Sequence, residues 1–189
     1  MIETYQKVEL LMRAGYVKRW HREAYVPSQS IAEHSWRVAI IAREVFGWGL
    51  NELGDILYHD VDEIFTGDIP ATTKWEAPEI KELLDRMAQN WRQAHDIDSM
   101  RLDGQAAIEF KVCDWSEAAL YCLEQLEIGN RNSNLSRTFY RLIYACEERA
   151  LDLQHVTDRD RAYQWISTLV IRWEELGGAN HTKEELTNE

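Results

Sequence analysis

Four residues in the chain have the types and spacing of a metal-ligand set. They are His34, the adjacent pair His59 and Asp60, and Asp114. Imidazole and carboxylate groups are the usual ligands of transition metals such as Zn, Mn, Co, Ni and Fe. Each of the four lies in a stretch with helical periodicity, and three helices can present ligands to one ion from different sides. The set therefore predicts one divalent metal site built from three helices.

A His-Asp dipeptide alone is weak evidence for such a site. With 6 histidines and 12 aspartates in 189 residues, chance gives about 0.4 such dipeptides. A second pair, His95-Asp96, stands where a polar helix is predicted to run out into an acidic loop. We expect the second pair to have no metal role, and the choice between the two depends on their surroundings.

The surroundings favour the first pair. Glu63 comes three residues after Asp60 and four after His59, so on a helix all three would share one face. A carboxylate in that place can orient or deprotonate a metal-bound water. The alternative is a solvated helix charge. However, Asp60, Asp62 and Glu63 crowd together without a nearby cation in the sequence, and such crowding is repulsive unless a cation lies among them.

Two further segments offer contacts for a phosphorylated ligand. The turn Thr66-Gly67-Asp68-Ile69-Pro70 comes directly after the predicted metal helix, which suits ligand binding, and Lys74 follows it. Upstream lies the densest basic cluster, Lys18-Arg19-Trp20-His21-Arg22. Arginine suits bidentate phosphate contact, and Trp20 offers a flat face. Taken alone, this cluster is better explained as a surface loop with a partly exposed tryptophan.

The elements that position these residues are predicted to be helices, which makes the fold class all-α. Ser30 and Glu33 form a capping-box pattern at the start of one helix, and Pro78 fits the first position of another. Gly15 is expected to end the first helix in a left-handed conformation. The six or seven predicted helices cover approximately residues 4–14, 31–46, 51–65, 78–94, 105–128, 135–152 and 158–176. They form a single-domain helical bundle over residues 1–177, followed by a polar, flexible tail over residues 178–189.

Charge and composition exclude several functional classes. The net charge of −12 disfavours binding to a nucleic-acid polymer. The odd number of cysteines (Cys113, Cys122 and Cys146) predicts reduced, buried thiols instead of disulfides. The sequence starts without a leader pattern, and its apolar runs are shorter than the roughly 18 residues of a spanning helix. We therefore expect a cytoplasmic protein without a membrane partner; for a viral protein this means the host cytoplasm.

Taken together, the motifs resemble the HD-domain phosphohydrolases, and within them the small 5′-deoxynucleotidase branch. The resemblance extends from about Arg13 to Glu127, and the combination is specific although each piece is weak. The segments that carry it are, in order, Arg19-Trp20, Ala32-Glu33-His34-Ser35, Tyr58-His59-Asp60 with Glu63, Thr66-Gly67-Asp68-Ile69-Pro70 with Lys74, and Lys111-Val112-Cys113-Asp114.

The resemblance implies a helical bundle around one divalent metal and a role for each matching residue. The ligands would be His34, His59, Asp60 and Asp114, and Glu63 would polarise the nucleophilic water. Asp68 would contact the sugar hydroxyl or the water. Phosphate and nucleoside contacts would come from Arg19, Trp20, Lys74 and Lys111. Members of this branch remove phosphate from deoxyribonucleoside 5′-monophosphates, usually as homodimers or larger homo-oligomers.

A close variant of the branch keeps a second reaction open. Some small phage proteins of this type hydrolyse deoxynucleoside triphosphates, notably dATP, and release triphosphate. The segment from Arg13 to His21 resembles them. Both reactions begin with the attack of an activated water on the α-phosphorus, and they differ in the basic surface that receives the outer phosphates. The leading prediction is a deoxynucleoside monophosphatase and the second is a dNTP triphosphohydrolase.

A reading outside enzymes is a bundle that binds nucleotides without catalysis. The loss of a ligand or of Glu63 would indicate it, and none of the matching positions is lost. A phosphodiesterase with two metals is less well supported, since the remaining histidines fall outside the helical frame that would deliver them to one site.

Overall fold

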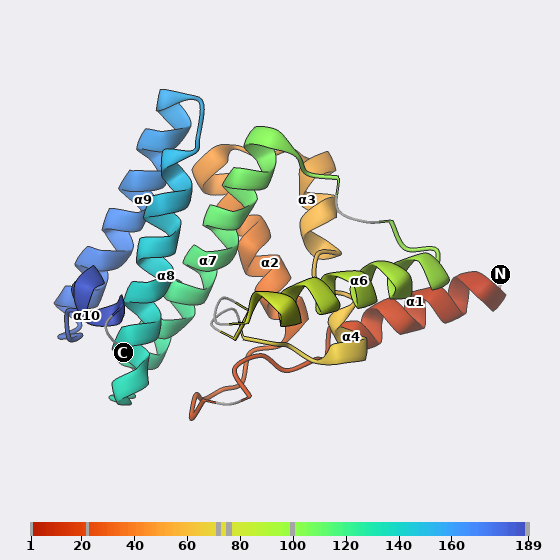
Figure 1. Ribbon diagram of the computed structural model, residues 1–189, viewed down its shortest axis with the longest axis horizontal. Coiled ribbons are helices and arrows are strands. Elements are labelled where there is room, and N and C mark those ends of the chain that lie inside the picture. The colour runs from red at the N-terminus through yellow and green to blue at the C-terminus, as the bar shows by residue number, and fades with distance from the viewer. Residues whose placement is uncertain (1, 22, 71–72, 75–76, 99–100, 188–189) are drawn as a thin grey trace. The chain divides into compact units, whose positions relative to one another are not determined.

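The computed structural model describes residues 2–21, 23–70, 73–74, 77–98 and 101–187. Within these ranges the regular structure is helical, with no strand beyond an isolated bridge between Lys18 and Ser30, so the all-α fold class is confirmed. The helices are, in order, α1 (Ile2–Ala14), α2 (Ile31–Ile41), the π-helical turn η1 (Ala42–Phe46), α3 (Leu50–Leu57), α4 (Glu63–Thr66), α6 (Pro78–Ala94), α7 (Gly104–Glu127), α8 (Ser133–Leu151), α9 (Val156–Glu175) and α10 (Lys183–Thr187) (Figure 1).

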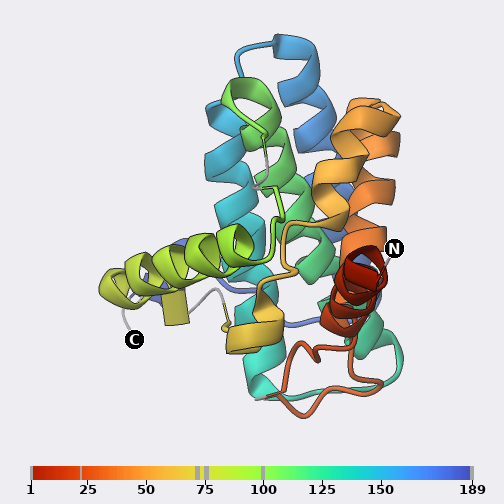
Figure 2. The ribbon, with the colours of Figure 1, turned by 90° about the vertical axis from the view of Figure 1, so that its right-hand side faces the viewer.

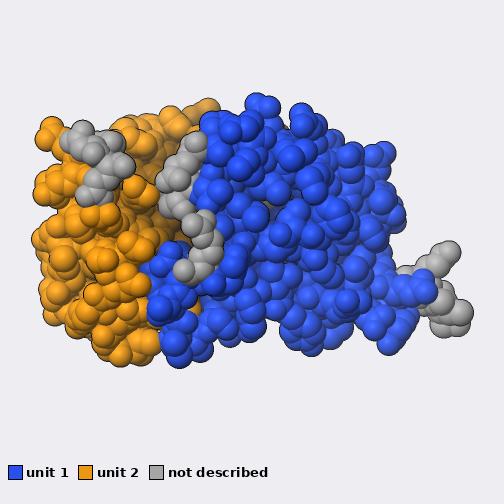
Figure 3. Space-filling model, turned by 60° about the horizontal axis from the view of Figure 1, so that its bottom comes forward, with its two compact units in different colours: residues 1–36, 54–101 blue, residues 37–53, 102–189 orange. Residues whose placement is uncertain are grey.

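The chain divides into two compact units, which Figure 3 shows in different colours. Unit 1 comprises residues 1–36 and 54–101, and unit 2 comprises residues 37–53 and 102–189. One domain over residues 1–177 stays a prediction. Among the described residues of both units, no helix combines the length and the hydrophobicity needed to cross a membrane.

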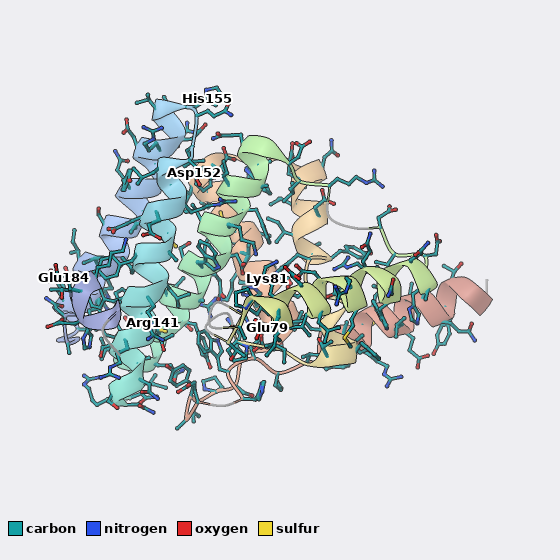
Figure 4. The ribbon with its side chains drawn as sticks, in the orientation of Figure 1. Glu79, Lys81, Arg141, Asp152, His155 and Glu184 are labelled. Carbon is teal, nitrogen blue, oxygen red and sulfur yellow. The ribbon has the colours of Figure 1, made fainter. Side chains whose placement is uncertain are left out.

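Unit 2 is built on α7, α8 and α9, which run side by side (Figures 1 and 2). Asp152 and His155 mark the short connection that makes α8 and α9 antiparallel neighbours (Figure 4). Phe139 of α8 stacks on Trp173 of α9 with the ring centroids 4.2 Å apart. Both side chains are buried, and fully burying an apolar side chain such as Phe contributes about 1.5–3 kcal/mol. The facing sides of α8 and α9 therefore belong to the core of the unit. The three cysteines are reduced and buried, as predicted.

The chain after α9 contacts α8, and the flexibility expected for residues 178–189 stays a prediction. The Tyr140 hydroxyl donates to Asn180 Oδ1 at 2.9 Å, and the Tyr144 hydroxyl donates to the His181 carbonyl oxygen at 2.7 Å. Leu186 of α10 is buried. The contacts with α8 are made by single polar groups, and Leu186 is the buried apolar residue of α10, so no apolar stripe in the sequence reveals them. Residues 188 and 189 lie outside the described residues.

Unit 1 has a smaller apolar core to which α1, α4 and α6 contribute. Helix α4 packs against both α1 and α6. The buried members of this core are small or medium-sized side chains, with larger apolar groups packed against them. The residues are Ala14, Val61 and Ile97, covered by Leu11, Ile64 and Trp91. This core therefore anchors the segment that follows α3 to two other helices.

Local interactions at the start of α2 confirm one prediction and correct another. The N–H of Ser30 donates to Glu33 Oε2 at 2.6 Å, and the N–H of Glu33 donates to Ser30 Oγ at 3.3 Å, which is the predicted capping box. Gly15, in contrast, is outside the left-handed range predicted for it. A Cβ atom at Gly15 would lie 3.1 Å from the Cβ of Ala32. The glycine therefore allows the chain after α1 to approach α2 closely.

Candidate metal centre

His34 lies in the first part of α2, where the capping box fixes the backbone. Its N–H donates to the Ser30 carbonyl oxygen at 3.0 Å, and the residue is completely buried. A ligand on a helix that is held in this way has its orientation set before an ion binds.

His59 and Asp60 lie in a turn between two helices, which corrects the prediction of one continuous helix. Helix α3 ends two residues before His59, and α4 begins three residues after Asp60. The N–H groups of His59 and Glu63 donate to carbonyl oxygens three residues earlier, instead of four. Three-residue hydrogen bonds wind the chain more tightly than an α-helix does. The shared helical face predicted for His59, Asp60 and Glu63 is therefore replaced by a tight turn that leads into α4.

Three of the predicted ligand side chains converge in unit 1. The Nε2 atom of His59 lies 3.2 Å from His34 Nε2 and 2.9 Å from Asp60 Oδ2, and His34 Nε2 lies 3.7 Å from the same oxygen. His59 Nδ1 lies 2.6 Å from the Ile56 carbonyl oxygen. Because a carbonyl oxygen can only accept, Nδ1 carries the proton and Nε2 offers a lone pair. Two imidazole nitrogens and a carboxylate that face one another fit a divalent transition metal.

Glu63 is a buried acid whose charge depends on a nearby cation. The residue is 7% exposed, its Oε1 lies 3.8 Å from Lys74 Nζ, and its buried Oε2 has no hydrogen-bond partner among the described residues. Burial raises the pKa of Glu63 to about 10, and the negative charges of Asp60 and Asp68 act in the same direction. The positive charges of Lys74 and Arg19 oppose the shift. A divalent cation among these acids would favour the ionised form of Glu63. The Oε2 atom of ionised Glu63 could then accept a proton from a water or a substrate.

The basic cluster and the Gly-Pro turn contact each other in unit 1. Asp68 Oδ2 accepts from the backbone N–H of Trp20 at 3.3 Å, and the Trp20 indole N–H donates to Gln29 Oε1 at 3.2 Å. Trp20 has a φ of 61°, a strained value for a bulky residue, which these two hydrogen bonds hold. The Arg19 guanidinium carbon lies 6.0 Å from a Trp20 ring centroid. The segment is therefore more than a surface loop, and Arg22 lies outside the described residues.

The remaining two predicted residues, Asp114 and Lys111, lie one turn apart on α7 in unit 2. Lys111 Nζ contacts Asp114 Oδ2 at 2.9 Å and lies 5.0 Å from the Phe110 ring centroid. This ion pair supplies Asp114 with a cationic partner within its own helix. The participation of Asp114 in a metal set stays a prediction.

The second His-Asp pair has a different environment. His95 follows α6, is exposed, and its Nδ1 lies 2.7 Å from the Trp91 carbonyl oxygen. Asp96 Oδ2 lies 3.3 Å from Lys7 Nζ. These are the contacts of a helix end and a surface ion pair.

Two residues that support the candidate centre were not identified from the sequence. Gln29 holds the Trp20 indole, as described above. Arg92 of α6 donates to the backbone carbonyl oxygen of His59 at 2.8 Å and to Asp62 Oδ1 at 2.6 Å. A single arginine near a helix end is common. The available indication was the crowding of acids around Asp60, which calls for a cation in space when none is present nearby in the sequence.

Comparison with known proteins gives this geometry a context. A family model described as 5′-deoxynucleotidase YfbR-like matches residues 7–109, more than half of the 189 residues. A dATP triphosphohydrolase of Salmonella phage PMBT28 is 29% identical over 187 residues, covering 90% of this chain and 87% of the relative. A 5′-deoxynucleotidase of Vibrio cholerae serotype O1 is 31% identical over 144 residues, covering 64% of this chain and 74% of the relative.

A solved structure supports the same assignment. The HD phosphohydrolase DatZ of cyanophage S-2L, bound to dA and one catalytic Zn²⁺ ion, matches with a TM-score of 0.68 and 26% identity. The match covers 86% of this chain and 96% of DatZ. The expected HD phosphohydrolase type of helical fold is thereby confirmed. Both the family model and the relatives lead to one conclusion: the chain is an enzyme that belongs to the YfbR-like 5′-deoxynucleotidase family.

Proposed function

We propose that the protein hydrolyses deoxyribonucleoside 5′-monophosphates to deoxynucleoside and phosphate with one divalent metal. The observation that carries this proposal is the convergence of His34, His59 and Asp60 in unit 1, together with a buried Glu63. Asp114 would supply the fourth ligand. The donor set suits Co, Mn, Zn, Ni or Fe. When bound, such a cation makes a water more acidic and offsets phosphate charge.

The chain's own residues would carry the remaining chemistry. Glu63 would accept the proton of the attacking water at its Oε2 while the water oxygen forms a bond to the α-phosphorus. The bond from phosphorus to the 5′-oxygen then breaks, and that oxygen takes up a proton. Arg19 and Lys74 would bind phosphate oxygens, and Trp20 would pack against the sugar or base. Asp68 would face the sugar, where a 2′-hydroxyl would need additional room and a partner.

Hydrolysis of dATP or another dNTP to triphosphate and nucleoside is the second candidate. The observations that favour it are the phage relative, which matches over 90% of this chain, and the similarity to a phage protein bound to dA. Lys74 and Lys111 would then bind the outer phosphates.

We further propose that the enzyme acts in the cytoplasm as a homodimer or a larger homo-oligomer. Light scattering of the purified protein tests the oligomeric state.

One experiment separates these activities. Protein freed of metal with a chelator is supplied with Co²⁺, Mn²⁺ or Zn²⁺ and incubated with each dNMP, each dNTP and the matching ribonucleotides. Chromatography then distinguishes nucleoside plus phosphate from nucleoside plus triphosphate. We expect metal-dependent turnover of deoxynucleotides and a lower kcat/KM for the ribonucleotides. Absence of turnover with every metal and substrate contradicts the proposal and favours a binding module.

A further inference from the structure

Arg92 is a buried cation that forms hydrogen bonds with the turn that carries His59 and Asp60. It is 6% exposed and lies near the end of α6. Its Nη2 donates to the carbonyl oxygens of Tyr58 and His59 at 2.6 and 2.8 Å. Its Nη1 donates to the Asp98 carbonyl oxygen at 3.1 Å. The guanidinium group therefore joins the turn before α4 to the chain after α6.

The charge of Arg92 is balanced by a side chain from the same turn. Its Nε donates to Asp62 Oδ1 at 2.6 Å, and its Nη2 also contacts that oxygen. An uncompensated arginine so close to a cation site would repel the ion. The pairing with Asp62 lets Arg92 bind the turn while adding little net charge.

The position of the His59 carbonyl oxygen bears directly on the direction of its imidazole. Arg92 fixes that oxygen, and the Ile56 carbonyl oxygen holds His59 Nδ1 at 2.6 Å. The backbone and the far side of the ring are thus both held, which leaves Nε2 facing His34 and Asp60. Metal affinity depends on ligand placement of this kind, and loss of a supporting group typically weakens it about 10- to 100-fold.

We propose that Arg92, paired with Asp62, is a positioning residue that fixes the turn carrying His59 and Asp60 and thereby sets the affinity and geometry of the metal centre. The inference rests on the proposed metal-dependent function. Arginine suits this task because its planar group offers several donors in a rigid arrangement, whereas lysine offers one flexible point charge.

The test measures metal binding by the whole protein, without turnover. Metal-free wild type, Arg92→Met, Arg92→Lys and Asp62→Asn are titrated with Co²⁺, and the visible absorption of bound Co²⁺ reports both affinity and ligand geometry. Circular dichroism and thermal unfolding of the metal-free proteins establish that each variant is folded. Arg86→Lys is the matched control, since Arg86 lies on the same helix and is exposed.

We expect the Kd for Co²⁺ to rise about 10- to 100-fold in Arg92→Met, and less in Arg92→Lys and Asp62→Asn, with an altered absorption spectrum. Arg86→Lys should match wild type. A folded Arg92→Met with wild-type affinity and spectrum overturns the inference. If Arg92→Met does not fold, the same result in Arg92→Lys and Asp62→Asn overturns it. Wild type that binds no Co²⁺ rejects the proposed metal centre itself, and this inference with it.

Discussion

The chain contains the dipeptide His-Asp twice, in opposite settings. His59 and Asp60 stand in a turn between two helices, where the ring of His59 is held by the Ile56 carbonyl oxygen and faces a completely buried His34. His95 and Asp96 follow α6 and are exposed. The same two side chains therefore contribute to a candidate metal centre in one place and to a helix end in the other.

The two pairs differ in their exposure to water and in the groups that hold their side chains. At the first pair, the side chains of His59 and Asp60 are 5% and 25% exposed, and an arginine and a backbone carbonyl group hold the histidine on two sides. At the second, both residues are exposed to water, which competes for their polar atoms, and their contacts are with Trp91 and Lys7 instead of with another candidate ligand. A ligand motif is thus defined by its supports as much as by its residue types.

Removal of a ligand from the first pair should have the largest effect. His59→Ala deletes one of the imidazole ligands, so we expect loss of bound metal and activity at background level. His34→Ala and Asp114→Ala should behave in the same way. Elemental analysis of the purified variants and a phosphate-release assay check this. His155→Ala, at the exposed α8–α9 connection (Figure 4), is the control. Stoichiometric metal in the His34 and Asp114 variants rejects the ligand set.

Glu63→Gln should keep the metal but lose most of the rate. The amide cannot accept the proton of the attacking water, and help from a general base is typically worth about 10²- to 10⁴-fold. We expect kcat to fall by that factor, with substrate binding retained. Steady-state kinetics and metal analysis check this, with Glu79→Gln in the first turn of α6 as the matched exposed control (Figure 4). If Glu63→Gln loses its metal, Glu63 is a ligand and the set of four is incomplete.

The same substitution should change how the stability of the metal-free protein depends on pH. Burial, with Asp60 and Asp68, raises the pKa of Glu63 from 4.5 to about 10 in the folded protein. A group whose pKa rises on folding contributes its full stability below the unfolded value and loses it as pH rises toward the folded value. Wild type should therefore lose stability between about pH 5 and 9, by at most about 1.4 kcal/mol per pH unit from this group.

Thermal unfolding of metal-free wild type and Glu63→Gln across this pH range measures the effect. The variant should have the shallower slope, and added Zn²⁺ should flatten the slope of wild type because the cation favours ionised Glu63. Asp96→Asn tests the exposed pair and should retain the wild-type slope. Equal slopes for wild type and Glu63→Gln would show that folding does not raise the pKa of Glu63.

The sequence is sufficient to predict the long helices because their ends and apolar faces are local features. The Ser30–Glu33 capping box and the start of α6 at Pro78 both occur as expected. The break between α3 and α4 was not predictable in this way. At this break Arg92, which is far along the chain, donates to the carbonyl oxygens of Tyr58 and His59. The chain after α9 likewise meets the hydroxyl groups of α8 only in the folded protein.

For the candidate site, the sequence pattern indicated residues that lie close together, but it did not indicate the residues that support them. His34, His59 and Asp60 converge as the pattern indicates, although the helical face used to argue for Glu63 is a turn. Gln29 and Arg92 hold this region through single side chains at unremarkable positions. A periodic pattern can identify a helix face, but it cannot identify which distant side chain will satisfy a particular carbonyl oxygen or indole.

The smallest effect is expected from His95→Ala in the second pair. Its imidazole lies against Trp91, with centroids 4.5 Å apart, and contacts the carbonyl oxygen of that residue. Replacements at exposed positions usually change stability by about 0.5 kcal/mol or less, which here means a shift of about 1–2 °C in Tm. Metal content and kcat/KM should stay within about two-fold of wild type. Because His59→Ala is the matched change in the first pair, the two variants compare one residue type in two settings. Loss of metal in His95→Ala would mean that the exposed pair, and not His59-Asp60, binds the ion.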